Sequence, residues 1–251
     1  MKKSDSAVAG GRMSLTGHLS ELRRRLVVCV VCFVVAMMAC LSTAPRLVTL
    51  LTELGKRYQY EYVYLAPQEL LSVYFGIALL GGLVISAPVI AYHAYAFASP
   101  GLKQQERMFF LLAMTFGALA FCIGVLFAYH VTTPFILYFL ISLRSGVDIA
   151  AAISVQEYIN FLLTLFLIFG LIFELPVVSV LLTRLGILKP AWLVKSRKVM
   201  VVIIFFLAAI ITPPDIASQI LVAVPMLGLF ELSVLLSRLC EHLKKPETEV
   251  Q

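Results

Sequence analysis

Long apolar runs constrain this chain more than any other feature of its sequence. Four of them lie at residues 26–44, 70–97, 108–129 and 158–183, and each has about the 20 residues that a helix needs to cross a bilayer. Backbone groups in hydrocarbon must be hydrogen-bonded within their own segment, so these runs predict transmembrane helices. Charged residues make up only 14% of the chain, against roughly 25% in soluble domains, which excludes a single water-soluble globule.

Two further apolar segments, at 199–211 and 216–236, flank a Thr-Pro-Pro-Asp sequence. Two adjacent prolines cannot continue a helix, so this region predicts a hairpin of two helices, with Asp215 capping the second. The first of the pair reaches only roughly 20 Å, against about 30 Å of hydrocarbon. Local thinning of the bilayer and burial against longer helices are both open explanations of this mismatch.

The distribution of Lys and Arg predicts the orientation of six spans. With a cytoplasmic N-terminus, sixteen of the 20 basic residues fall in cytoplasmic segments. This agrees with the tendency of basic residues that flank membrane spans to stay on the cytoplasmic side. A seventh span at 135–143 would place the basic loop 184–198 outside, so we interpret that stretch as an interfacial segment, broken from the third span by Pro134. The predicted organisation is a cytoplasmic segment with an amphipathic helix (1–25), a six-helix transmembrane domain (26–236) and a cytoplasmic tail (237–251).

A second amphipathic segment follows the first span. Leu47, Leu50, Leu51 and Leu54 recur at helical spacing with polar residues between them. This pattern predicts a short helix lying on the outer surface of the membrane.

Glu174 lies within the fourth apolar run, about 24 Å along its axis. A carboxylate at bilayer depth costs about 3 kcal/mol or more, so this side chain should face protein or water. One interpretation is a protonated carboxyl bonded to a carbonyl that Pro176 leaves free. The other is a docking point for a polar group on another membrane helix, or a proton relay.

Two predicted cytoplasmic acids, Glu21 and Glu106, are surrounded by positive charge. The structural interpretation pairs Glu21 with Arg25 and Glu106 with Lys103 along their helices. If both acids faced one groove, they would form an acidic site suited to guanidinium groups, which bind carboxylates through two parallel hydrogen bonds.

Motifs of catalysis and metal binding are absent from the sequence. The four histidines are scattered, and no zinc-protease, nucleotide-binding or serine-hydrolase motif occurs. The basic residues flank the apolar runs and form no tract of their own. We therefore expect no enzymatic activity, no cofactor, no metal and no nucleic-acid partner.

Five motifs follow one another along the chain. They are residues 18–25 (His-Leu-Ser-Glu-Leu-Arg-Arg-Arg), 86–88 (Ser-Ala-Pro), 97–102 (Phe-Ala-Ser-Pro-Gly-Leu) with the nearby Glu106, 173–177 (Phe-Glu-Leu-Pro-Val) and 212–215 (Thr-Pro-Pro-Asp) with the nearby Gln219. In this order on six predicted spans, they resemble the TatC family, the polytopic subunit of the twin-arginine, Sec-independent protein translocase.

The resemblance implies an all-α, concave, glove-shaped bundle of six transmembrane helices in a bacterial cytoplasmic membrane, with the last two helices short and both termini cytoplasmic. It also implies that the protein binds twin-arginine signal peptides of folded precursor proteins. Assembly with TatA- and TatB-type single-span partners into an oligomeric complex would then allow export driven by the proton-motive force. The alternative, from another functional class, is a proton-coupled secondary transporter of a small solute in which Glu174 carries the protons.

The resemblance also assigns roles to individual residues. The implied signal-peptide-binding residues are His18, Glu21, Arg23, Phe97 and Glu106. The implied intramembrane residues that meet partner helices are Glu174, Thr212 and Gln219. We assign structural caps and helix breaks to Pro100, Pro176, Pro213, Pro214 and Asp215.

Overall fold

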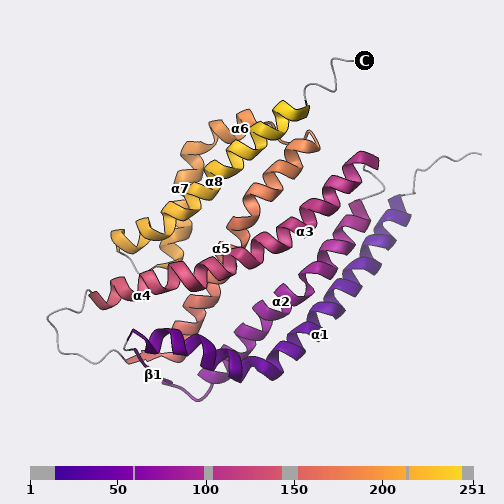
Figure 1. Cartoon of the computed structure of the whole chain (residues 1–251). Helices are drawn as coiled ribbons and strands as arrows, with labels where there is room; N and C mark the ends of the chain where they lie inside the picture. Colours follow the sequence, from indigo (N-terminus) through magenta and orange to yellow (C-terminus); the bar gives the residue numbers. More distant parts are fainter. Residues whose placement is uncertain (1–14, 59, 99–103, 143–151, 213–214, 245–251) are drawn as a thin grey trace, which may run out of the picture.

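The apolar runs form long helices in the computed structural model of the chain, which describes residues 15–58, 60–98, 104–142, 152–212 and 215–244 (Figure 1). The elements in chain order are α1 (Leu15–Lys56), β1 (Glu61–Val63), α2 (Glu69–Ala98), α3 (Gln104–Phe127), the π-helix η2 (Ala128–Thr132), α4 (Thr133–Ser142), β2 (Ala152–Ser154), α5 (Val155–Arg184), α6 (Pro190–Lys195), α7 (Arg197–Ile211) and α8 (Ile216–Lys244).

Five helical runs within these ranges are long and apolar enough to cross a membrane. They are formed by α1, α2, the continuous run from α3 to α4, α5 and α8. The fifth predicted span, 199–211, corresponds to α7, whose 15 residues extend over only about 22 Å. The sequence-based expectation of an all-α membrane bundle is therefore confirmed, with one helix shorter than a full bilayer crossing.

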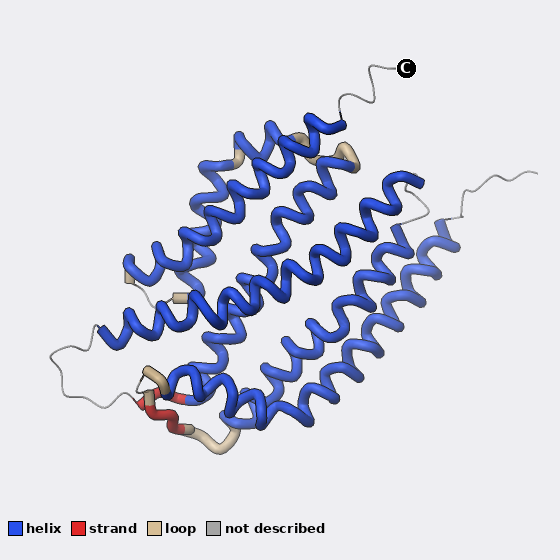
Figure 2. The backbone as a smooth tube through the Cα atoms, in the orientation of Figure 1, coloured by secondary structure: helices blue, strands red, loops and turns tan. Residues whose placement is uncertain are grey.

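The helices form a layer in which the run from α3 to α4 crosses in front of α5 (Figure 1). α1 packs against α2 on one side, α5 contacts α2, α3 and α8, and α7 packs on α8 at the other side. The first described turn of α1, the start of α3 and the ends of α5 and α8 lie at the same end of the layer, which we call the terminal end. The opposite end, which carries β1 and β2, is called the loop end (Figure 2).

α1 corrects the prediction of separate amphipathic helices before and after the first span. The lead-in segment, the span and the surface segment form one helix of 42 residues that contains Pro45. α1 changes direction where it approaches the loop end (Figure 1), as expected where a proline removes a backbone hydrogen-bond donor. Leu51 and Leu54 are buried beyond the bend, so this part of α1 covers the loop end of the bundle.

α4 corrects a second expectation, because Pro134 does not separate it from the third span. The chain passes from α3 through the π-helix into α4 without leaving helical structure. The hydroxyl of Thr133 donates a hydrogen bond of 2.8 Å to the carbonyl of Ala128. A π-helical turn therefore accommodates the proline by inserting an extra residue into the helix.

The loop end is tied together by contacts between segments that are distant in sequence. β1 and β2 pair in parallel, and the Ser154 hydroxyl donates to the buried Glu69 carboxylate at 3.0 Å. The Tyr158 hydroxyl donates to the carbonyl of Leu51 at 3.1 Å. The Tyr62 ring lies 4.9 Å from that of Tyr158, and its burial raises the pKa of the Tyr62 phenol. These contacts fix α1, α2 and α5 relative to one another.

The last two helices differ in length, although the resemblance implied that both are short. α8 has 29 residues, and an ion pair of 2.6 Å joins Glu231 in its middle to Arg197 at the start of α7. The part of α8 beside α7 is therefore as short as α7. The remainder of α8 continues past α7 along α5, where the Ser179 hydroxyl reaches the carbonyl of Ser233 at 3.4 Å.

Candidate functional site

Glu21 is the best defined of the predicted binding acids. It lies on the second turn of α1 at the terminal end, where the Nε of Arg25 donates to its Oε1 at 2.9 Å and a second guanidinium nitrogen donates to the same oxygen. The other carboxylate oxygen, Oε2, is buried and has no hydrogen-bonding partner among the described residues. The pairing with Arg25 is the one that helical spacing predicts, and it leaves half of the carboxylate unused.

Glu106 is the third residue of α3, which also begins at the terminal end (Figure 1). The positive end of the helix dipole favours an acid at this position. The side chains of Glu106 and His18 lie outside the part of the chain that the structure describes. Arg23 is exposed on α1, and Phe97 is half-buried near the end of α2. The helices that carry these predicted residues therefore meet at one end of the molecule.

Glu174 is half-buried on α5, and its carboxyl has no hydrogen-bonding partner among the described residues. Pro176 lies two residues further on inside the same helix and does not end it. The hydroxyl of Ser179, not Glu174, donates to a carbonyl near the proline, that of Pro176 itself at 3.0 Å. The interpretation of Glu174 as a protonated partner of a carbonyl freed by the proline stays a prediction.

The hairpin of α7 and α8 holds the remaining predicted polar residues. The side-chain amide of Gln219 donates to the carbonyl of Phe205 at 2.9 Å, which joins the two helices. Thr212 is buried, and its hydroxyl donates to the carbonyl of Ala208 at 3.0 Å. Asp215 accepts a hydrogen bond of 2.7 Å from the backbone nitrogen of Ser218, the arrangement of a helix cap. Pro100, Pro213 and Pro214 lie outside the described residues.

The structure does not bring Glu174 together with Thr212 and Gln219. α5 and α8 both end at the terminal end, and the contact between Ser179 and Ser233 fixes their register. Glu174, five residues before Ser179, therefore lies level with residue 228 of α8. Gln219 lies nine residues further toward the loop end, which corresponds to about 13 Å along the axis. The intramembrane polar residues therefore form two separate positions rather than one cluster.

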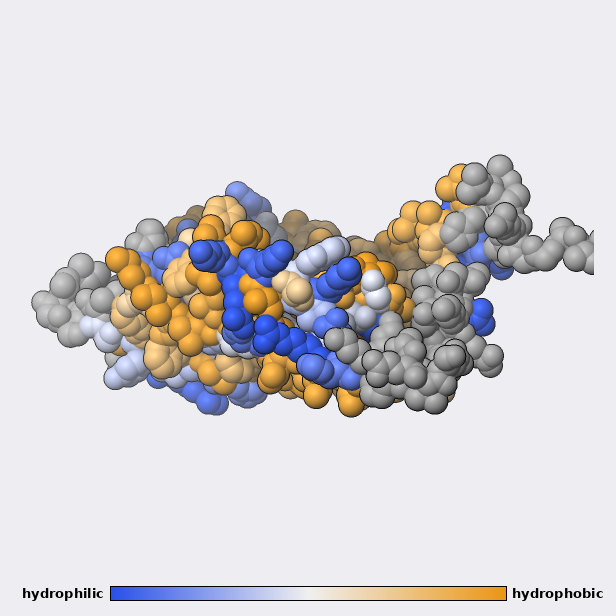
Figure 3. Space-filling view, turned by 90° about the horizontal axis from the view of Figure 1, so that it is seen from above, coloured by the Kyte–Doolittle hydropathy of each residue, from blue (hydrophilic) through white to orange (hydrophobic). Residues whose placement is uncertain are grey.

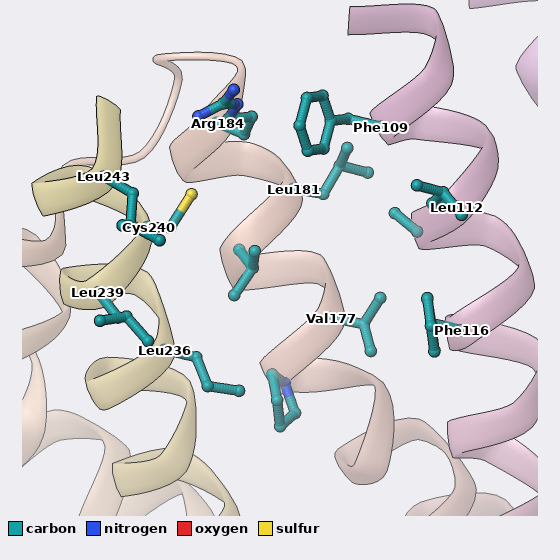
Figure 4. A pocket seen from close by; sticks show the side chains of 13 residues that line it. Phe109, Leu112, Phe116, Val177, Leu181, Arg184, Leu236, Leu239, Cys240 and Leu243 are labelled. Atoms are coloured by element: carbon teal, nitrogen blue, oxygen red, sulfur yellow. The ribbon is translucent and has the colours of Figure 1, made fainter. Parts of the chain in front are cut away.

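A groove opens between α3, α5 and α8 at the terminal end (Figure 4). Its volume is about 690 Å³, and its lining is apolar except for Arg184 and the thiol of Cys240. Each helix contributes side chains one or two turns apart, such as Phe109 and Phe116 on α3. The guanidinium of Arg184 lies 4.3 Å from the centre of the Phe109 ring. In Figure 4 both side chains stand at one end of the groove.

Sequence reasoning missed two features of this end of the molecule. The first is Glu231, an acid inside the predicted span 216–236, whose ion pair with Arg197 marks where α7 begins. Its charge within an apolar run was a signal that could have located this boundary. The second is the groove, which depends on how three distant helices pack and has no signature in any one of them.

In the part of the chain that the structure describes, no three side chains of the metal-binding type gather to hold an ion. Figure 3 shows hydrophobic side chains over much of the molecule, with hydrophilic residues in a band across the face seen from above. Such a surface presents both lipid-facing and polar regions to other molecules.

Comparisons with known proteins agree with this architecture. A family model described as Sec-independent protein translocase protein (TatC) matches residues 17–225. The translocase protein TatCy of Bacillus subtilis (strain 168) is 37% identical over 227 residues, which cover 90% of this chain and 89% of the relative. TatC of Aquifex aeolicus (strain VF5) is 36% identical over 236 residues, 93% of this chain and 98% of the relative.

A solved structure of a twin-arginine translocase receptor, TatC, superposes with a TM-score of 0.80. It is 34% identical, and the match covers 89% of this chain and 99% of that one. A second crystal structure of the receptor, in the detergent DDM, gives a TM-score of 0.76. Together with the membrane-length helices, these matches indicate a multi-pass protein of the bacterial inner membrane that takes part in twin-arginine protein transport. The chain therefore belongs to the TatC family of Sec-independent protein translocase subunits.

Proposed function

We propose that the terminal end of this translocase subunit binds twin-arginine signal peptides of folded precursors through Glu21 and Glu106. The observation that carries the proposal is the half-used carboxylate of Glu21, whose Oε2 is buried without a partner among the described residues. A buried carboxylate oxygen without a donor is costly. A guanidinium from a second chain would supply the missing donor.

Arg25 occupies one oxygen of the Glu21 carboxylate and leaves the other for an incoming arginine. It already donates two hydrogen bonds to Oε1, so an incoming arginine adds to this pair at Oε2 and does not need to displace it. A guanidinium presents a planar set of N–H donors, whereas a lysine ammonium is a compact charge without this geometry. We therefore expect the site to prefer an arginine pair over a lysine pair of the same charge.

Three further residues complete the proposed peptide site. Phe97 is the last residue but one of α2, whose end lies between the starts of α1 and α3, and it offers an apolar surface for residues that follow the arginines. His18 precedes Glu21 by about one turn of α1. Arg23 is exposed on the same helix and is suited to acidic or carbonyl groups of the peptide.

Single-span partners of the TatA and TatB type are proposed to dock at the two intramembrane polar positions. The carboxyl of Glu174 has no partner among the described residues, and a polar group on a neighbouring helix would relieve that cost at bilayer depth. Thr212 and Gln219 mark the second position. Because their side chains already bond to α7 carbonyls, their contribution is to the shape of the hairpin that a partner contacts.

The proposed orientation places the terminal end, and with it both chain termini, in the cytoplasm. The basic residues of the sequence favour it, and it puts the helix ends that carry Glu21 and Glu106 on the side from which precursors approach before export. Export would use the proton-motive force once the partners have assembled. Cysteine-accessibility labelling at Ser20 and at Glu61 would test this orientation, with Ser20 labelled from the cytoplasmic side only.

Site-specific crosslinking tests the two binding assignments separately. A photoreactive residue replaces Glu106 in one variant and Glu174 in another, and each is expressed with a twin-arginine precursor and the single-span partners. We expect the first to capture the precursor and the second to capture a partner. Leu171, exposed on α5 one turn before Glu174, serves as the control position. Capture of precursor at neither acid, or equal capture from Leu171 and Glu174, would contradict the assignments.

A further inference from the structure

We propose that the groove between α3, α5 and α8 binds an anionic phospholipid, with one acyl chain along the groove and the phosphate beside Arg184. The groove lies at the terminal end, where the apolar run of α3 begins and that of α5 ends. Its occupant must therefore be apolar along most of its length and negatively charged at that end. A membrane phospholipid with a net negative headgroup has this chemistry.

The lining supports an acyl chain. The groove is apolar from Phe116 up to Arg184 (Figure 4), so along this length it offers no polar partners to ordered water. Phe116 is 58% exposed, Leu239 55% and Leu243 66%, so the groove is open along its side and a lipid can enter from the bilayer. An acyl chain in the groove would give these side chains van der Waals contacts that they lack when the groove is unfilled.

The position of the charge supports a headgroup. Phe109 holds the guanidinium of Arg184 at the mouth of the groove by a contact of 4.3 Å with its ring. A guanidinium that stacks on a ring through its face can still donate hydrogen bonds to a phosphate through the N–H groups at its edge. Basic pockets between transmembrane helices near a membrane surface are typical sites for anionic lipid headgroups.

The charge of the groove favours an anionic lipid over a signal peptide. The guanidinium of Arg184 would repel the arginines of such a peptide, which makes this groove distinct from the proposed peptide site at Glu21.

Photolabelling of the full-length protein in vesicles tests the proposal. The vesicles are phosphatidylcholine with a trace of either phosphatidylglycerol or phosphatidylcholine that carries a photoreactive acyl chain. We expect the phosphatidylglycerol probe to label peptides of α3, α5 and α8 more strongly than the phosphatidylcholine probe. Arg184→Gln should lower phosphatidylglycerol labelling about fivefold, the effect of one basic residue at an anionic surface. Leu181→Trp should fill the groove and lower labelling by both probes.

The control is Arg238→Gln, which removes an exposed charge from α8 outside the groove and should leave labelling unchanged. Circular dichroism and gel filtration establish that each variant is folded. Equal labelling by the two probes, or equal loss in Arg184→Gln and Arg238→Gln, would overturn the proposal. A benzophenone residue at Phe116 in cells provides a second test. Capture of phospholipid supports the assignment, and capture of a polypeptide refutes it.

Discussion

The packing of α3 against α5 depends on two glycines that face each other across the helix pair. A β-carbon on Gly124 would lie 2.6 Å from the carbonyl oxygen of Phe169 and 3.0 Å from the Cα of Gly170. Carbon atoms in ordinary contact are about 3.5–4.0 Å apart. The atoms in the way belong to the backbone of α5, so no side chain can turn aside, and Gly124→Ala must push the two helices apart.

The size of this effect follows from two opposing contributions. Forcing one extra methyl group into a packed contact costs about 1–3 kcal/mol. Alanine is more favourable than glycine in a helix by about 1 kcal/mol. Gly124→Ala should therefore destabilise the fold by up to about 2 kcal/mol. Gly117→Ala on the same helix has nothing within 4 Å of the new β-carbon, so it should stabilise the fold by up to about 1 kcal/mol.

Denaturant unfolding in mild detergent, followed by circular dichroism, measures both variants under identical conditions. Because they share the same chemical change on the same helix, the difference between them isolates the steric contribution. We expect Gly124→Ala to be the less stable by about 1–3 kcal/mol. Equal stabilities, or a less stable Gly117→Ala, would refute the close approach of α3 and α5. The fold around the groove would then require revision.

Three further predictions concern polar groups of α8 and of the aspartate that caps it. Gln219→Leu removes the bond to the Phe205 carbonyl and should lower the free energy of unfolding by about 1 kcal/mol, whereas Ile220→Leu on the exposed neighbouring position should not. Hydrogen bonds from Ser218 lower the pKa of Asp215 below its ordinary value, so its stabilising effect should be present above the ordinary pKa of an aspartate and be lost as the pH falls through the lowered pKa; Asp215→Asn should abolish this part of the pH dependence of unfolding. The buried Ser237 hydroxyl has no partner among the described residues, so Ser237→Ala should leave the melting temperature unchanged or raise it, while a clear decrease would indicate a hidden hydrogen bond.

The membrane-length helices could be predicted because length and apolar composition act locally. Each apolar run needs about 20 residues to cross the bilayer, and the runs at 70–97, 108–129 and 158–183 all lie inside observed helices. The helix boundaries were less predictable. The first span was expected to end at residue 44 and Pro134 to break the helix after the third span, yet α1 continues through Pro45 with a bend and a π-helical turn follows α3.

The candidate site was predictable in its residue types but not in its arrangement. Helical spacing predicted the pair of Glu21 and Arg25, which the structure contains. The spacing of residues along one helix could not indicate that Glu174 and Gln219 lie at different depths, because that depends on the register of α5 against α8. The groove and the pair of Arg197 with Glu231 are likewise products of tertiary packing.

The central claim is that acids at the terminal end recognise the guanidinium groups of a paired arginine. Binding of a fluorescent signal peptide to the purified protein in nanodiscs tests it most directly, with an Arg-Arg peptide compared with its Lys-Lys counterpart. We predict at least about tenfold tighter binding of the Arg-Arg peptide, equivalent to about 1.4 kcal/mol. This preference should be lost in Glu106→Gln and retained in Glu241→Gln, which removes an exposed acid from α8. Equal affinity of the wild-type protein for the two peptides would contradict the claim.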